Sequence, residues 1–372
     1  MVKFLTITFI TLTLFSYNSC SSFFQRSWQT MNKDIFKTIK VNLGKFDIPL
    51  EIKSSGKIYQ EMPDPQEFDS IYFFKPSEMR EKIKLSFGNG EFIFKDLPYR
   101  GELEIIPDKK SGKYIFVNKL PMEDYLLGVV AAEMPSGWHL EALKSQAVAA
   151  RTYAVDSILA SPYSTYHVES TTQSQVYGGI KRETVRSNQA VRETKGEILL
   201  YKDRPARTFY HSNSGGITES PEFVWGYTGL NYLLVVESPH CKAATNFEWK
   251  INLTRAEMQE KLKSLELEEI KNIKVTESTP SGRAKLIEIE GKEKTISMNA
   301  VEFRRAIGQI LMRSLLFEIE LQEDVFRITG RGFGHGVGMS QWGSKGMAEK
   351  DYDYKDILAY YYKGTELVII EQ

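Results

Sequence analysis

Residues 120–135 decide the fold, and they read Leu-Pro-Met-Glu-Asp-Tyr-Leu-Leu-Gly-Val-Val-Ala-Ala-Glu-Met-Pro. They predict a short helix with a defined start and end. Pro121 is tolerated in a first helical turn, and the acids Glu123 and Asp124 suit the positive end of the helix dipole. Pro135 stops the helix. One apolar stripe at helical spacing contains Met122, Tyr125, Leu126, Val129 and Val130.

A second helix is predicted immediately afterwards, over about residues 139–160. Its alanines, such as Ala147 and Ala154, allow another backbone to approach closely. The residues expected to face inward are Leu140, Leu143, Ala147, Ala154 and Ile158.

Strands and turns are predicted on the amino-terminal side of this helix pair. Residues 39–43 and 82–87 alternate apolar and polar side chains, and residues 91–95 form an aromatic and β-branched run. Between residues 39 and 117 there is no His or Cys. We interpret this region as a scaffold, with a binding surface as the other option.

On the carboxy-terminal side, capping signals predict helices that start at Thr254 and Asn299, with a charged hairpin over residues 271–296 between them. A last helix near residues 354–363 is expected to end at Gly364. Meandering strands with segregated helices predict an α+β fold.

The composition excludes several classes of protein. The chain has 372 residues, with 48 basic and 48 acidic side chains and a net charge of zero. It therefore has no global field to hold nucleic acid or an anionic membrane surface. Two cysteines, Cys20 and Cys241, exclude a disulfide-stapled scaffold and a four-cysteine zinc site. No two of the five histidines stand at helical ligand spacing, so we expect no metal and no cofactor.

The first 20 residues are typical of an export signal. Lys3 gives a basic start, and residues 4–16 are an uncharged apolar run that is too short to span a bilayer. Cys20 follows Ser19 as in a bacterial lipoprotein signal, although Tyr17 stands where Leu is usual. Acyl chains on Cys20 would anchor the protein to a membrane, and plain secretion is the alternative. We therefore expect an exported protein of the cell envelope.

Glu133 is the first candidate for chemistry. It lies eleven positions after Met122 and continues the apolar stripe, in the last turn of the helix. Burial and the helix dipole should both raise the pKa of this carboxyl group. A protonated acid near neutral pH is what a glycosidic leaving oxygen needs. A structural Glu paired with Arg151 or Lys144 is the competing interpretation, and spacing alone slightly favours it.

Arg151 lies on the inward stripe of the second helix, four residues after Ala147. Because a buried Arg must be paired, it either bridges the two helices or clamps a substrate carboxylate or Glu133. The spacing leaves these alternatives open.

Two loops are further candidates. Residues 211–216, with His211 and Ser214, combine short polar side chains with adjacent glycines, and their backbone N–H groups could bind sugar hydroxyls. Residues 330–343 contain six glycines, and His335, Gln341 and Trp342 could form a polar wall with a platform for sugar stacking. The alternative for residues 211–216 is an ordinary turn. The alternative for residues 330–343 is a glycine-rich connection whose aromatic side chains pack into the core.

These motifs together resemble the SpoIID/LytB family. The resemblance rests on residues 120–135 and 141–154, on Gln175-Val176-Tyr177-Gly178-Gly179, on both loops above, and on residues 357–365. It is dense from about residue 119 to the end of the chain. The resulting domain prediction is a signal over 1–20, a β-rich region over 21–118 and a SpoIID/LytB core over 119–372.

The resemblance implies a peptidoglycan lytic transglycosylase that prefers glycan strands without stem peptides, with Glu133 as the catalytic acid. Some members bind zinc through a cysteine pair, but the positions expected here are Val168 and Ser174, so we predict no zinc. LytB-type relatives imply the alternative of a wall-binding modifier that stimulates a separate amidase. The residues expected to bind substrate are Arg151, Tyr177, His211, Ser214, His335 and Gln341.

Overall fold

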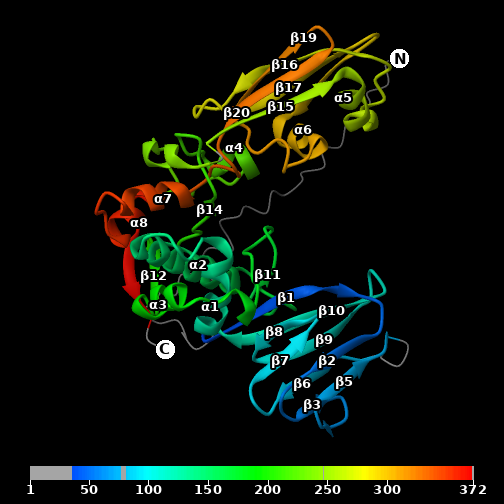
Figure 1. Ribbon diagram of the computed structural model, residues 1–372, viewed down its shortest axis with the longest axis vertical. Coiled ribbons are helices and arrows are strands. Elements are labelled where there is room, and N and C mark those ends of the chain that lie inside the picture. Colours follow the sequence, from blue (N-terminus) through cyan, green and yellow to red (C-terminus); the bar gives the residue numbers. More distant parts are fainter. Residues whose placement is uncertain (1–35, 77–80, 246, 371–372) are drawn as a thin grey trace, which may run out of the picture.

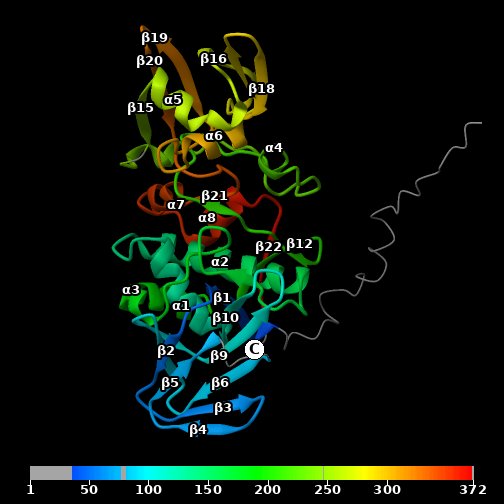
Figure 2. The same cartoon turned by 90° about the vertical axis from the view of Figure 1, so that its right-hand side faces the viewer.

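The computed structural model describes residues 36–76, 81–245 and 247–370, so the predicted signal and Cys20 lie outside the described residues. The fold is α+β, as predicted. The molecule is elongated, with a β-rich end, a helical middle and a second β-rich lobe at the far end (Figures 1 and 2).

The amino-terminal region consists of two sheets. Phe46, Phe94 and Phe116 pack between them with ring centroids 4.9–5.6 Å apart. The seven-stranded sheet has the order β11-β1-β10-β9-β6-β3-β4, and the four-stranded sheet has the order β5-β2-β7-β8. The strands are β1 (Thr38–Phe46), β2 (Leu50–Lys53), β3 (Ile58–Met62), β4 (Gln66–Phe68), β5 (Ile71–Phe74), β6 (Ile83–Phe87), β7 (Glu91–Phe94), β8 (Leu97–Arg100), β9 (Glu102–Asp108), β10 (Lys113–Pro121) and β11 (Val168–Glu169).

The helical middle is built around α1 (Met122–Glu133) and α2 (Leu140–Ala160), at the places that the sequence predicts. Every residue of the predicted α1 stripe is buried, and His139 caps the start of α2. The neighbouring elements are α3 (Val185–Glu193), β12 (Glu197–Tyr201), β13 (Arg204–Pro205), β14 (Tyr210–His211), α4 (Pro221–Trp225), β21 (Met339–Ser340), α7 (Gln341–Ala348), α8 (Tyr354–Tyr361) and β22 (Glu366–Ile369).

The last helix ends earlier than predicted. Helix α8 stops at Tyr361, and its C-cap is Tyr362, not Gly364. The Tyr362 side chain is fully buried, and its hydroxyl group donates to the Phe209 carbonyl over 2.9 Å. The chain leaves the helix at Tyr362, where this hydrogen bond holds the side chain in place. Gly364 takes a left-handed conformation in the turn that follows.

Residues 248–331 form a lobe with a hydrophobic core of its own, separate from the main core. The predicted hairpin and capped helices lie here, and Thr254 forms a capping box with Glu257. The sequence did not separate this lobe from the rest of the core domain. Its elements are β15 (Glu248–Thr254), α5 (Arg255–Lys261), β16 (Ile270–Ser278), β17 (Ala284–Gly291), β18 (Thr295–Asn299), α6 (Ala300–Ile307), β19 (Phe317–Gln322) and β20 (Val325–Arg331).

Among the described helices, none is both long enough and apolar enough to cross a membrane.

Candidate active site around Glu133

Glu133 ends helix α1, and segments from three other parts of the chain meet at its carboxyl group. Its Oε1 atom accepts a hydrogen bond from the Val176 backbone N–H over 2.7 Å. Its Oε2 atom accepts one from the Gln341 side-chain amide over 3.3 Å. The Tyr210 hydroxyl group, at the start of β14, is a third hydrogen-bond partner.

Burial raises the pKa of Glu133, and these three hydrogen bonds oppose that rise. All three donors are neutral. Within the described residues, neither cation proposed from the sequence as a structural partner for Glu133 pairs with it, because Arg151 pairs with Glu123 and Lys144 pairs with Glu141 and Glu193. Glu133 is therefore a partly exposed acid whose carboxyl group is desolvated and, among the described residues, has no paired cation, as a proton donor needs.

A chain of hydrogen bonds extends behind Glu133. Tyr125 donates to the Gln175 side-chain oxygen over 3.0 Å, and the Gln175 amide donates to the Tyr210 hydroxyl oxygen over 3.1 Å. This leaves the Tyr210 proton to bond Glu133. Gln341 also donates to the Gln146 oxygen over 3.3 Å. Tyr125, Gln146 and Tyr210 were not predicted as site residues; Gln341 and the motif around Gln175 were the sequence signals for this network.

The structure places Arg151 in the core, with no exposed surface. Its guanidinium group forms two hydrogen bonds of 2.8 Å to the Glu123 carboxylate and also donates to the Glu197 and Val191 carbonyls. Arg151 therefore bridges α1 and α2, the alternative to the predicted substrate contact, and leaves no exposed surface of its own for a substrate.

Tyr177 and Ser214 are also placed inside the protein. The Tyr177 hydroxyl group donates to Asn118 over 3.0 Å, and its ring lies where a side chain at Gly128 would clash. Ser214 is fully buried, with its oxygen 3.3 Å from the Cys241 sulfur. These contacts indicate packing roles and correct the expectation that the two side chains touch substrate.

His211 and His335 bond to the backbone of the glycine-rich loop. His211 Nδ1 lies 3.0 Å from the Val337 carbonyl oxygen, which requires Nδ1 to carry the proton. His335 Nδ1 accepts from the Val337 N–H over 3.0 Å. Burial lowers the pKa of His335 to about 3 and that of His211 well below its usual value, so both rings are neutral at physiological pH.

Arg283 joins the second lobe to both predicted loops. Its guanidinium group is buried and donates to the carbonyls of Ser214 over 2.7 Å, Ile217 over 2.9 Å and Thr218 over 3.2 Å. Gly336, with φ of +85°, lies against the same group, and a Cβ atom there would come within 2.6 Å of Arg283 Nη2. The lobe thus fixes the loops that carry Tyr210 and Gln341.

Aromatic side chains stand next to both side-chain donors of Glu133. Trp342 follows Gln341, and its ring lies 4.8 Å from that of Trp138. Phe209 precedes Tyr210, and its ring lies 4.5 Å from that of Trp225. Trp138 and Trp342 are partly exposed, and Trp225 is 39% exposed. Flat apolar rings with open faces suit the apolar faces of sugars.

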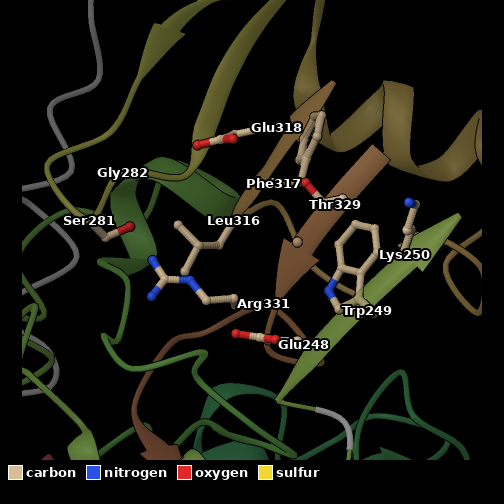
Figure 3. Close-up of a pocket in the computed structure, with 11 residues that line it drawn as sticks. Glu248, Trp249, Lys250, Ser281, Gly282, Leu316, Phe317, Glu318, Thr329 and Arg331 are labelled. Atoms are coloured by element: carbon tan, nitrogen blue, oxygen red, sulfur yellow. The ribbon is translucent and has the colours of Figure 1, made fainter. Parts of the chain in front are cut away.

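A separate hollow of about 750 Å³ lies in the second lobe, where the Arg331 side chain extends towards Ser281 (Figure 3). It contains none of the residues around Glu133. Its lining residues are Glu248, Trp249, Lys250, Ser281, Gly282, Leu316, Phe317, Glu318, Thr329, Gly330 and Arg331.

Val168 and Ser174, which stand where some family members have zinc-binding cysteines, have other contacts in this structure. Val168 is buried in β11, and the Ser174 hydroxyl oxygen accepts from the Glu169 N–H over 3.0 Å. Cys241 is buried, with its thiol 3.0 Å from the Ser238 carbonyl oxygen. In the described part of the chain, no three His, Cys, Asp or Glu side chains gather as a metal would require.

The chain matches two protein families and is similar to several known proteins. A family described as stage II sporulation protein (SpoIID) matches residues 110–201, and a domain of unknown function (DUF8618) matches residues 230–338. An uncharacterized protein of Brachyspira hyodysenteriae is 38% identical over 280 residues, which cover 74% of each chain. Stage II sporulation protein D of Bacillus subtilis is 35% identical over 268 residues, covering 68% of this chain and 75% of that protein. The amidase enhancer of the same organism is 31% identical over 292 residues, covering 65% of this chain and 40% of that protein.

The SpoIID match includes both helices of the pair, Glu133 itself, and the Gln175–Val176 segment that bonds to its carboxyl group and to Tyr210. The match to stage II sporulation protein D covers three quarters of that protein. The chain therefore belongs to the SpoIID/LytB family.

Proposed function

We propose that the protein is a peptidoglycan lytic transglycosylase in which Glu133 is the general acid and then the general base. Membership of the SpoIID/LytB family supports a function at the cell wall. The observation that carries the finer proposal is the partly exposed Glu133 carboxyl group, whose pKa is raised by desolvation and which receives hydrogen bonds only from neutral donors. A raised pKa favours the protonated form of this carboxyl group, which can then release its proton to a substrate oxygen.

In the first step, protonated Glu133 gives its proton to the glycosidic oxygen that follows muramic acid, and the bond from this oxygen to C1 breaks. In the second step, the Glu133 carboxylate takes the proton of the C6 hydroxyl group of the same sugar, while O6 attacks C1. The products are a free hydroxyl group on one strand and an anhydro-muramic end on the other. No water is consumed, and Glu133 regains its proton, so one carboxyl group suffices.

The hydrogen-bond donors around Glu133 assist both steps. Val176, Gln341 and Tyr210 stabilise the carboxylate after it has released its proton. They therefore keep the pKa of Glu133 from rising so far that proton release becomes costly. The Trp138–Trp342 pair next to Gln341 offers a surface on which the strand can lie.

The test is a digest of peptidoglycan from which an amidase has removed the stem peptides. Mass spectrometry should find anhydro-muramic ends with the wild-type protein and none with Glu133→Gln. Glu260→Gln, on the exposed face of α5, is the matched control and should behave as wild type. Anhydro ends in the Glu133→Gln digest at wild-type rate would refute the assignment of the acid.

A second candidate function is a modifier that binds the wall and stimulates a separate amidase. It is favoured by the similarity to a relative named amidase enhancer, of which this chain covers 40%. An added amidase should then release stem peptides faster in the presence of this protein, and Glu133→Gln should stimulate it equally well. If the wild type also forms no anhydro ends, the modifier function replaces the enzyme.

We also propose that the chain is exported and anchored through Cys20. The short apolar run and the residues before Cys20 support this, and Tyr17 departs from the usual signal. In cells fed a labelled fatty acid, label should appear in the wild type and be lost in Cys20→Ala. An unlabelled wild type, recovered in the soluble fraction, would favour plain secretion.

A further inference from the structure

The segment that leads into Tyr210, a hydrogen-bond partner of Glu133, carries a partly exposed cation, Arg207. Along residues 206–209, Ala206 and Thr208 are buried, whereas Arg207 and Phe209 are partly exposed. Arg207 precedes Tyr210 by three residues, a distance that extended chain spans in at most about 10 Å. This limit is comparable to the length of one disaccharide, so a glycan strand of several sugars bound at Glu133 is long enough to extend to Arg207.

The Arg207 guanidinium group is only partly used by the protein. Its Nε donates to the Asp156 carboxylate over 2.7 Å, and its side chain is 32% exposed. In the described structure, neither terminal nitrogen has a protein acceptor. Its central carbon lies 5.6 Å from the centre of the Tyr227 ring. The guanidinium group is thus held in place by one carboxylate and one ring, with two N–H₂ groups left to bind an acid.

An aromatic patch of Phe209, Trp225 and Tyr227 adjoins this cation, which contacts the patch through Tyr227. The rings of Phe209 and Tyr227 are nearly parallel, 9° apart with centroids 6.4 Å apart, and Trp225 lies 6.0 Å from Tyr227. Trp225 is 39% exposed and Tyr227 is 44% exposed. Large apolar surface that a protein leaves open beside a cation suits a ligand that is flat, apolar on one face and acidic.

We propose that Arg207 is a specificity-determining residue that binds the lactyl carboxylate of muramic acid, while the sugar ring lies on Trp225 and Tyr227. This rests on the function proposed above. In a strand without stem peptides the lactyl group ends in a carboxylate, which a guanidinium group binds through charge-assisted hydrogen bonds. A stem peptide turns this carboxylate into a neutral amide and removes the charge that Arg207 would bind.

The experiment compares three substrates: peptide-free strands, the same strands with the lactyl carboxylate converted to its N-methylamide, and strands with intact stem peptides. The readout is kcat/KM for the formation of anhydro ends. The wild type should prefer the carboxylate strands over the N-methylamide strands by on the order of 10- to 100-fold, as for a hydrogen bond between charged groups. Arg207→Gln should lower activity on the carboxylate strands alone, and this preference should disappear.

Two further variants keep the result interpretable. Arg204→Gln, an exposed arginine three residues earlier, removes the same charge and should keep the wild-type preference. Arg207→Gln alone leaves the Asp156 carboxylate without its cation, which can prevent folding. The double variant Asp156→Asn with Arg207→Gln removes that carboxylate as well and serves if the single variant does not fold. It should also show no preference between the two peptide-free substrates.

Equal wild-type activity on carboxylate and N-methylamide strands would overturn the proposal while leaving the transglycosylase function intact. If strands with intact stem peptides are cleaved as well as the carboxylate strands, the acid bound by Arg207 belongs to the peptide, and the lactyl assignment is wrong. Absence of anhydro ends from all three substrates would instead refute the proposed function.

Discussion

Replacing Tyr210 with phenylalanine removes one hydrogen bond from the Glu133 carboxyl group and little else. Tyr210 bonds Glu133 and accepts from Gln175, whose amide still has the Ala150 carbonyl oxygen at 3.2 Å. The ring that fills the space between β14 and α1 is retained. The perturbation therefore acts on the acid and not on the packing around it.

The size of the effect follows from the type of bond. A hydrogen bond to a charged acceptor is worth about 1.5–3 kcal/mol, and one pKa unit corresponds to about 1.4 kcal/mol. The bond from Tyr210 stabilises ionised Glu133 and lowers its pKa, whereas burial raises it. Without the hydroxyl group, the pKa of Glu133 should rise by a further 1–2 units, approximately.

The assay is kcat/KM for the formation of anhydro ends as a function of pH. Because the free enzyme must carry a proton on Glu133, activity falls as pH rises through the pKa of Glu133. In Tyr210→Phe this basic limb should move to higher pH by about 1–2 units. Tyr361→Phe is a matched control, since it removes another buried hydroxyl group, which bonds Ser238 over 2.8 Å.

A basic limb that stays in place or moves to lower pH in Tyr210→Phe would refute this account of the Glu133 pKa. Both variants should first show wild-type circular dichroism and unfolding midpoints. A limb that moves equally in Tyr361→Phe would show that loss of any buried hydroxyl group causes the shift, and would equally contradict the specific role of Tyr210.

Three further results are expected. Arg151→Met should destabilise the protein by about 3–5 kcal/mol in urea unfolding, because it removes the cation that is paired with the Glu123 carboxylate; wild-type stability with lost cleavage would instead indicate a substrate role. Gly336→Ala should cost at least about 1–2 kcal/mol in the same assay, because of its positive φ and the clash with Arg283; an unchanged midpoint would show that the loop can rearrange. Trp342→Ala should raise KM for peptide-free strands and leave the basic limb in place, and a shifted limb would argue against a purely binding role.

The helix pair was predictable because its signals are local. The stripe from Met122 to Val130 and the position of Glu133 on it follow from residues within a few turns of one helix. The raised pKa of Glu133 was expected from burial and the helix dipole, and in the structure burial is its largest cause. Periodicity and capping report on single elements, and α1 and α2 are single elements.

The partners of these residues were not predictable, because they come from distant segments. Spacing left Arg151 with several possible acids, and the structure pairs it with Glu123, 28 positions earlier. Tyr210 lies outside any periodic run, and only the tertiary fold brings it to Glu133. Gln341 was predicted as a wall residue, but its bond to an acid 208 positions away could not be.

The second lobe was missed for a related reason. Its hairpin and two capped helices were expected, whereas β15, β19 and β20 were not. Its independent core depends on contacts such as that between Phe303 and Phe317, whose rings stack 6.4 Å apart. Sequence patterns show which side chains are buried and not which core they join. The role of Arg283 was likewise not predicted, because its four acceptors are three backbone carbonyls and the Ser281 hydroxyl group, which leave no pattern in the sequence.

The most direct test of the central role of Glu133 is a digest of peptide-free strands in water labelled with ¹⁸O. With the wild type, the new muramic ends should be anhydro ends without ¹⁸O, since O6 of the sugar and not water attacks C1. With Glu133→Gln, these ends should be absent while the strands still bind. New reducing ends that carry ¹⁸O in the wild-type digest, or anhydro ends that persist in Glu133→Gln, would contradict the account.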